Sequence, residues 1–359
     1  MATLGLRQSL DARNEMTQPI AYRDAGVDID AASRATEKIK ELARGTFNER
    51  TLSEIGSFGG MFDGSFPDLR QPVLVASADG VGTKLKIAFL AGIHNTIGRD
   101  LVNHCVNDIL VQGARPLFFL DYVATGKLSP GVVAEVIEGI VGGCRENGCV
   151  LLGGETAEMP GFYSASEYDL AGFIVGVVGR DKVIDGKQIV AGDVLLALRS
   201  AGLHTNGYSL ARKLFFEVAG YDVRTYVEKL GSTVVEALLQ PHLSYLRPLA
   251  ELIDKRLIKG LAHITGGGLT DNIPRILPAG TAVSIKKGSW PILPVFDLLQ
   301  QIGNVSEAEM FRTFNMGVGM VIVCSSQHVS KIEEHLSTQG QKCYEIGKVT
   351  SGDRAVTFE

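Results

Sequence analysis

Apolar segments of strand length alternate with segments of helical periodicity along most of this chain, and this alternation restricts the fold more than any other feature. The pattern predicts helices over 31–43 (with Asp30 as N-cap), 83–91, 97–112, 130–146, 207–219 and 242–255. It predicts strands over 73–78, 116–123, 149–152, 168–178, 194–198, 261–264, 282–285, 319–323 and 344–349. Such an order is typical of an α/β protein with α+β character and mixed sheets.

A polar stretch at 179–192 separates two such series, and a chain of 359 residues suits about two domains of roughly 150 residues each. We therefore expect an N-terminal domain over 21–180 and a C-terminal domain over 181–359. Residues 1–20 are polar and aperiodic, and we expect them to be a disordered extension.

Charge and hydropathy exclude several classes of protein. The net charge is -5 and no long Lys/Arg block occurs, which argues against a nucleic-acid surface. No apolar run reaches the ~18 residues that span a bilayer, and the first residues lack the apolar segment of a signal peptide. The five cysteines form no CxxC pair, which favours reduced thiols and a cytoplasmic protein without nucleic-acid or membrane partners.

Glycine is in excess, with 42 residues where about 25 are usual for this length, and the surplus gathers in a few loops. One such loop, DGVGTK at 79–84, lies between a predicted strand and a predicted helix. There the backbone of Gly80, Gly82 and Thr83 can approach an anion, Lys84 can neutralise a phosphate and Asp79 can hold a divalent cation. A tight strand-to-helix turn explains the same residues equally well, and the spacing is not that of a Walker A loop.

Two further carboxylates suggest a metal site. Asp108 lies near the C-terminus of its predicted helix, where the helix dipole disfavours a negative charge unless a cation is near. Glu155 directly follows a predicted short strand. If Asp79, Asp108 and Glu155 converge on one rim of the sheet, they suit Mg²⁺, although a solvated helix face also accounts for Asp108.

Glycine-rich motifs also occur in the second half and near the N-terminus. HTNGYS at 204–209 presents N–H groups and hydroxyls to a phosphate monoester, or is an ordinary helix cap. HITGGG at 263–268 has three consecutive glycines, which favour close approach of a ligand, and His263 is either a general base or a core histidine. The loop 56–62 either folds over nucleotide phosphates or is a solvent loop. No signature of a protein nucleophile is present.

These segments, in this order, resemble the phosphoribosylformylglycinamidine cyclo-ligases, also called AIR synthetases. The resemblance runs from YRDAGVD at 22–28 almost to the C-terminus, and it leaves out only the first ~20 residues. It rests on DGVGTK at 79–84, VNDILVQGARPLFFLDY at 106–122, GGETAEMPG at 153–161, HTNGYSLAR at 204–212 and HITGGGLTDNIPR at 263–275.

The resemblance implies ATP-dependent closure of formylglycinamidine ribonucleotide (FGAM) to 5-aminoimidazole ribonucleotide (AIR), with release of ADP and phosphate, in purine biosynthesis. ATP phosphorylates the formyl oxygen, the amidine nitrogen attacks that carbon, and no protein nucleophile is required. The resemblance also implies an AIR-synthetase-like fold and a homodimer in which N-terminal strands, here including 168–178, pair across the two chains.

Residue by residue, the resemblance assigns the cofactors ATP and Mg²⁺ and the substrate to named positions. Its metal ligands are Asp79, Asp108 and Glu155, and its nucleotide contacts are Gly59, Gly60, Gly80, Gly82, Thr83 and Lys84. Its substrate contacts are Asn206, Gly207, Ser209, Gly266, Gly267 and Gly268. His263 is assigned to proton transfer at the cyclising amidine.

Two alternatives remain open at this point. One is another ATP-using enzyme of the same superfamily, such as thiamine-monophosphate kinase or selenophosphate synthetase. The latter carries a reactive cysteine in its N-terminal glycine-rich loop, and 56–62 contains none. The other is a non-catalytic nucleotide-binding module, which needs only one anion site, whereas this chain has glycine clusters in both halves.

Overall fold

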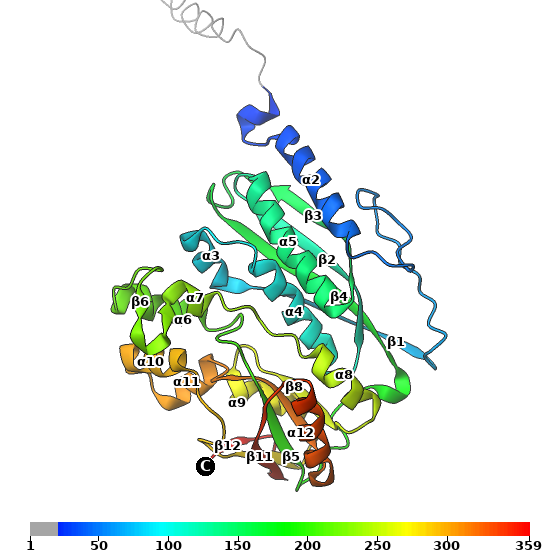
Figure 1. Ribbon diagram of the computed structural model, residues 1–359, viewed down its shortest axis with the longest axis vertical. Coiled ribbons are helices and arrows are strands. Elements are labelled where there is room, and N and C mark those ends of the chain that lie inside the picture. The colour runs from blue at the N-terminus through cyan, green and yellow to red at the C-terminus, as the bar shows by residue number, and fades with distance from the viewer. Residues whose placement is uncertain (1–20) are drawn as a thin grey trace, which may run out of the picture.

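The computed structural model describes residues 21–359, which form two mixed sheets with helices packed against each (Figure 1). The first sheet has the order β1-β4-β2-β3. Its strands are β1 (Pro72–Gly80), β2 (Arg115–Thr125), β3 (Val150–Glu158) and β4 (Tyr168–Gly179). β4 is antiparallel to both β1 and β2, whereas β2 and β3 are parallel.

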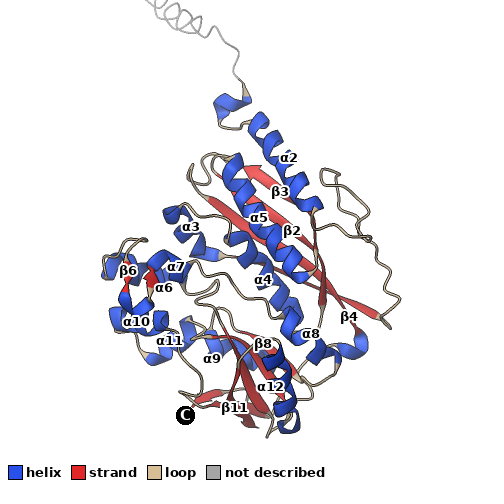
Figure 2. Ribbon diagram, viewed as in Figure 1, coloured by secondary structure: helices blue, strands red, loops and turns tan. Residues whose placement is uncertain are grey.

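Three helices lie on one side of the first sheet: α2 (Ile29–Arg44), α4 (Ile97–Leu110) and α5 (Pro130–Asn147) (Figure 2). The apolar stripe predicted on α4 is confirmed, since Ile97, Leu101, Cys105 and Ile109 are fully buried. The short helix α3 (Leu85–Ala91) follows β1 through one 3-10 turn. On the opposite side of the sheet, Leu74 and Phe173 stay 63% and 44% exposed.

The second sheet has the order β12-β9-β11-β5-β10-β8 and is antiparallel except where β12 meets β9. Its strands are β5 (Val194–Arg199), β8 (Gly260–His263), β9 (Thr281–Ile285), β10 (Val318–Cys324), β11 (Cys343–Ser351) and β12 (Val356–Phe358). β6 (Tyr226–Val227) and β7 (Ser232–Thr233) form a separate small ribbon.

The helices of the second half are short. They are α6 (Tyr208–Arg212), α7 (Val234–Leu238), α8 (Leu246–Asp254), α9 (Gly268–Asn272), α10 (Pro294–Gly303), α11 (Glu307–Thr313) and α12 (Val329–Thr338). Among the described residues, none of the helices is long and apolar enough to cross a membrane. The predicted disordered extension over 1–20 lies outside the described residues.

Several predicted boundaries are wrong for identifiable reasons. The first helix begins two residues early, because Asp28 rather than Asp30 is the N-cap and accepts a hydrogen bond from the Ala31 N–H at 3.0 Å. The expected short strand over 149–152 continues to Glu158, because β2 supplies pairing partners along its whole length. The expected helix over 242–255 begins only at Leu246, because the preceding backbone is held by α4.

Candidate functional site

Three motifs far apart in the sequence meet between the two sheets. The Thr83 and Ser209 hydroxyl oxygens are 3.1 Å apart, which joins 79–84 to 204–209. The Asn206 side-chain oxygen lies so close to Gly266 that an added Cβ there would sit 3.2 Å from it. The fold therefore brings the 79–84, 204–209 and 263–268 motifs to one place. Motifs that bind the same set of ligands must lie together in this way.

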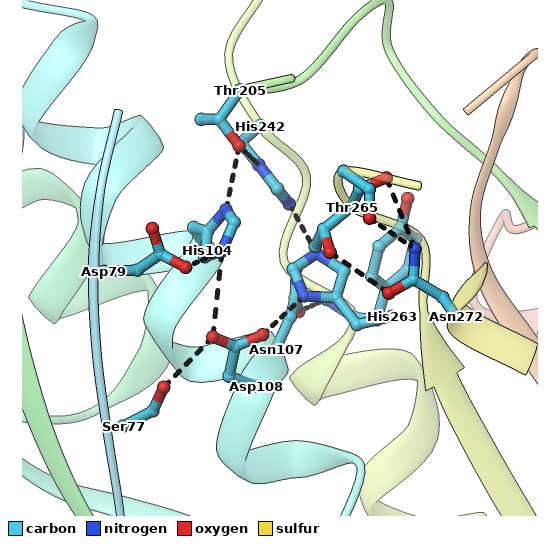
Figure 3. A network of polar contacts seen from close by, with 12 residues as sticks. Ser77, Asp79, His104, Asn107, Asp108, Thr205, His242, His263, Thr265 and Asn272 are labelled. Atoms are coloured by element: carbon cyan, nitrogen blue, oxygen red, sulfur yellow. Dashed lines mark hydrogen bonds and ion pairs between the residues drawn. The ribbon is translucent and has the colours of Figure 1, made fainter. Parts of the chain in front are cut away.

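At this place a closed ring of polar contacts links both halves of the chain (Figure 3). The His263 Nδ1 is 2.8 Å from the Asp108 carboxylate, and the His263 Nε2 is 3.0 Å from the His242 Nε2. The His242 Nδ1 faces the Thr205 hydroxyl at 3.4 Å, and that hydroxyl is 2.8 Å from the His104 Nδ1. The His104 Nε2 closes the ring at 3.7 Å from Asp108.

Asp79 joins this ring through His104, whose Nε2 lies 2.8 Å from the Asp79 carboxylate. We call the six residues the histidine–carboxylate cluster: Asp79, His104, Asp108, Thr205, His242 and His263. Asp79 comes from the end of β1, and His104 and Asp108 lie one turn apart on α4. His263 ends β8. The cluster is therefore assembled only when the two sheets are docked.

The hydrogen-bond directions in the cluster follow from its carboxylates. Because an ionised carboxylate can only accept, the His263 Nδ1–H donates to Asp108, which leaves the His263 Nε2 to accept from His242. His104 lies between the Thr205 hydroxyl and the Asp79 carboxylate. Two donating nitrogens on His104 satisfy both partners, which corresponds to the protonated imidazole.

The pKa shifts agree with these directions. Burial alone would lower the pKa of His104, but its hydrogen bond to Asp79 and the charges of both carboxylates raise it. Burial would raise the pKa of Asp79 and of Asp108, yet His104 and His263 respectively hold both carboxyls below their usual range. Burial lowers the pKa of His242 and of His263, so both are neutral near pH 7. The cluster thus combines two ionised carboxylates and a protonated His104 with the neutral imidazoles of His242 and His263.

The polar face of α4 holds the backbone before α8. The Asn103 amide donates to the His242 carbonyl at 2.8 Å, and the Asn107 amide donates to the Leu243 carbonyl at 2.8 Å. Asp100 accepts from the His242 N–H at 2.6 Å. These side chains replace the hydrogen bonds that a strand or helix would give this segment, and they fix the His242 ring in the cluster.

Lys84 does not occupy the place that the sequence predicted. Its side chain is 0% exposed, its ammonium lies 2.7 Å from the Asp100 carboxylate, and it donates to the Gln240 carbonyl at 2.8 Å. Its ammonium is thus enclosed and already paired with a carboxylate and a carbonyl. The assignment of Lys84 as a nucleotide contact is not supported, and we interpret it as a residue that joins the two halves.

Glu155 is not brought together with Asp79 and Asp108. β1 and β3 are the two edges of the first sheet, and β4 and β2 lie between them. At about 4.8 Å per strand, this places the Glu155 backbone roughly 14 Å from that of Asp79. Glu155 also lies in the interior of β3 rather than beyond its end. Within one chain, the predicted three-carboxylate site is therefore reduced to Asp79 and Asp108.

Glu155 instead lines a second hollow, which we call the sheet-edge pocket, with a volume of about 560 Å³. Its wall comprises 54–60 from the N-terminal loop, 120–122 of β2, 152–156 of β3 and Phe173. Gly59 and Gly60 are here, and Gly60 fits closely against Leu152, whereas Gly59 has open space around it. Burial, with a smaller contribution from the charge of Glu155, raises the pKa of the neighbouring Asp121 to about 7.

The glycines of 263–268 have structural explanations as well. Gly267 has a φ of +94°, which disfavours other residues, and a Cβ at Gly268 would lie 2.0 Å from the Phe311 carbonyl. The Asn272 amide donates to the Gly268 carbonyl at 2.8 Å and holds the turn. Gly266, beside Asn206, is the member of the three that faces the other motifs. A Cβ at Gly207 would collide with the Phe314 ring.

Sequence reasoning missed His104, His242 and Asp121 as site residues. The i, i+4 spacing of His104 and Asp108 on a predicted helix was a usable signal, because such pairs share one face. His242 had no local signal, because its role depends on α4, more than 130 residues earlier. Asp121 looked like part of an apolar strand.

Comparison with known proteins identifies the class. The family model "AIR synthase related protein, N-terminal domain" matches residues 68–178, and the corresponding C-terminal model matches 190–358. The two matches cover most of the chain and define an AIR-synthase-related protein with both of its domains.

Curated relatives define the family within this class. A phosphoribosylformylglycinamidine cyclo-ligase of Alkaliphilus oremlandii is 51% identical over 337 residues, covering 94% of this chain and 99% of the relative. One from Geobacillus thermodenitrificans is 51% identical over 332 residues, covering 92% and 96%. The chain belongs to the phosphoribosylformylglycinamidine cyclo-ligase family, which confirms the resemblance described above.

Solved structures share the fold at low sequence identity. Thiamine-monophosphate kinase from Stenotrophomonas maltophilia has a TM-score of 0.64 at 16% identity and covers 91% of this chain and 96% of its own. The hydrogenase maturation protein HypE, solved in complex with ATP, has a TM-score of 0.64 at 17% identity, covering 89% and 88%. These likenesses support the two-domain, mixed-sheet fold predicted from the sequence.

Proposed function

We propose that this protein is an ATP-dependent cyclo-ligase that converts FGAM to AIR with release of ADP and phosphate, a step of purine biosynthesis. One observation carries the proposal beyond the family relationship: 79–84, 204–209 and 263–268 meet at one cluster between the two halves. A kinase of the same fold and a non-catalytic nucleotide-binding module remain the alternatives.

Mg²⁺ suits the carboxylate side of the cluster. Asp79 and Asp108 direct oxygens toward the same nitrogen of His104, at 2.8 and 3.7 Å, and both carboxyls have lowered pKa values. Oxygen ligands are those that Mg²⁺ prefers, so these two residues would hold it. When bound, the ion neutralises phosphate charge during transfer. His104 is placed where the cation would be, and in the absence of metal it supplies a positive charge to the carboxylates.

The remaining motifs are assigned by their positions. We assign Ser209, Asn206 and Gly266 to the substrate, because they surround the cluster from the second half. Thr83 lies beside these residues, because its hydroxyl is 3.1 Å from that of Ser209. We assign Gly59, Gly60 and Glu155 to the sheet-edge pocket, where their role is separate from that of Asp79.

His263 is our candidate for proton transfer at the cyclising amidine, where the attacking nitrogen must lose a proton. Its side chain is nearly buried, and Asp108 and His242 occupy its two nitrogens. Asp108 orients the ring and stabilises its charged form, which is the arrangement expected of a general base. Accepting a proton then requires the His242 contact to rearrange.

We further propose that the protein is a cytoplasmic homodimer. The side of the first sheet that the helices leave uncovered exposes Leu74 and Phe173, and β4 contributes apolar residues to it. Pairing of two such faces would bury them. The expected result is a dimeric mass by light scattering, reduced to that of a monomer by Phe173→Glu. A monomeric wild-type protein would contradict this proposal.

The activity is tested by measuring ADP release with ATP, Mg²⁺ and FGAM, omitting each in turn. A cyclo-ligase releases ADP only with all three, and AIR appears in equal amount. ADP release with thiamine monophosphate in place of FGAM would favour the kinase. ATP binding without turnover on any substrate would favour the binding module.

A further inference from the structure

The three histidines of the cluster form a nearly equilateral triangle (Figure 3). The centroids of the His104 and His242 rings are 5.3 Å apart, those of His104 and His263 are 5.0 Å apart, and those of His242 and His263 are 5.1 Å apart. The planes of each pair are inclined at 64–67°. The three rings therefore surround one centre at nearly equal distances.

These spacings match a tris-imidazole metal site. With nitrogen ligands 2.0–2.1 Å from Zn²⁺ and each ring centre about 1.1 Å behind its nitrogen, tetrahedral angles separate the centres by about 5 Å. The His242 Nε2 and His263 Nε2 are already 3.0 Å apart, near the roughly 3.3 Å between two ligands of one zinc ion. One nitrogen from each of the three rings lies within 4.8 Å of the others.

The outer partners of these rings are those that support metal-bound histidines. The His263 Nδ1 donates to Asp108 at 2.8 Å, which leaves its Nε2, beside the His242 Nε2, as the ligand atom. His104 has Thr205 on one nitrogen and Asp79 on the other, both at 2.8 Å. Binding the ion requires one of these nitrogens to release its proton and its contact, while the other contact anchors the ring. Carboxylate–histidine–metal pairing of this kind fixes ring orientation and raises the basicity of the ligand.

The charge balance also favours a cation. Three histidines at most 7% exposed surround a centre flanked by the Asp79 and Asp108 carboxylates, so a divalent ion there meets two compensating charges. Nitrogen ligands select a borderline transition metal such as Zn²⁺ over Mg²⁺, which prefers oxygen.

We propose that His104, His242 and His263 form a binding site for a borderline divalent transition metal, for which Zn²⁺ is the probe. The site joins α4 and β8 to the segment before α8, and its occupation fixes the two halves against each other. Where the proposed function holds, the bound ion also withdraws His263 from proton transfer and inhibits cyclisation. The binding itself does not depend on that function.

The test is a Zn²⁺ titration of the full, metal-free chain without ATP or substrate, in competition with a chromophoric chelator. We expect one Zn²⁺ per chain, a rise in melting temperature on binding, and at least a tenfold loss of affinity in His242→Gln and in His104→Gln. His328→Gln, remote from the cluster, is the matched control and should bind as the wild type does.

Asp79→Asn separates this site from a carboxylate site. It should still bind one Zn²⁺ per chain, with an affinity lowered by no more than about 10- to 100-fold, because Asp79 only supports a ligand. The proposal is overturned if both histidine variants, folded by circular dichroism, bind as the wild type does, or if Asp79→Asn abolishes binding that His242→Gln retains. If His242→Gln does not fold, His104→Gln alone decides. Because no substrate is present, failure of the proposed function leaves these results unaffected.

Discussion

The histidine–carboxylate cluster and the sheet-edge pocket each contain an aspartate, and the pKa values of the two aspartates are shifted in opposite directions. Asp79 and Asp121 lie in one row of the first sheet, each in register with Gly172 of β4. Beside His104, the pKa of Asp79 is lowered. Asp121 is buried near another carboxylate, Glu155, and its pKa is raised to about 7. The two residues share a row of the sheet, but Asp79 has a cationic hydrogen-bond partner that offsets its burial, whereas Asp121 is buried without one.

Asp100 is a fully buried carboxylate paired with Lys84, and removing Lys84 should lower the free energy of unfolding more than any other change considered below. Lys84→Met leaves Asp100 fully buried without a counter-charge, which should cost about 3–5 kcal/mol of unfolding free energy. Urea denaturation measures the loss. The double variant Lys84→Met/Asp100→Asn should recover part of the stability, and a single variant as stable as the wild type would exclude the pair as a joint between the halves.

For activity, we proposed that the cluster and not the pocket holds Mg²⁺, and paired substitutions test this. Asp79→Asn should lower ADP release in the complete assay at least a hundredfold, about 2.7 kcal/mol, because one of two carboxylates for Mg²⁺ is lost. Its fold should survive, since Asp79 is half exposed. Asp121→Asn is the matched change in the same row and should retain most activity. Near-normal turnover in Asp79→Asn would remove that residue from the metal site.

The raised pKa of Asp121 in the sheet-edge pocket should lower the free energy of unfolding at high pH. The folded-state pKa of Asp121, about 7, lies above its unfolded value, so stability rises as pH falls toward 5 and is lost as pH rises through 7. Asp121→Asn removes this loss. We expect the variant to be more stable than the wild type by about 2 kcal/mol at pH 8 and nearly equal to it at pH 5. Urea midpoints at the two pH values test this, and equal midpoint differences would contradict it.

The buried histidines of the cluster should make the free energy of unfolding fall as pH drops, which is the opposite of the effect of Asp121. The change expected for each histidine is smaller. Burial lowers the pKa of His242 in the folded state, so its stability contribution is complete above pH 6.5 and falls as pH drops below that value. The slope is about 1.4 kcal/mol per pH unit for each such histidine. His242→Gln should flatten the stability profile between pH 6.5 and 5.5 by this amount, whereas an unchanged slope would mean that His242 is not neutral when folded.

The sequence allowed prediction of the features that depend on local patterns. The buried stripe of α4 follows from helical spacing. Asp79 and Asp108, predicted as ligands of one metal ion, lie with His104 so that one ligand atom of each is within 4.8 Å of the others. Glu155 was misplaced because strand order is set by long-range pairing: two strands separate β1 from β3, and β3 is lengthened by β2. The enclosed position of Lys84 could not be foreseen, because its partners, Asp100 and Gln240, lie 16 and 156 residues further along the chain.

The hydrogen bonds from α4 to the backbone before α8 form late during synthesis of the chain. Asp100 and His242 are 142 residues apart, and all four strands of the first sheet precede His242 in the chain. During synthesis, the acceptors and donors on α4 are therefore complete before the segment that they bind has emerged. The first half serves as a template on which His242 is positioned, and a ribosome-bound chain stopped near residue 200 would present this polar face of α4 to water.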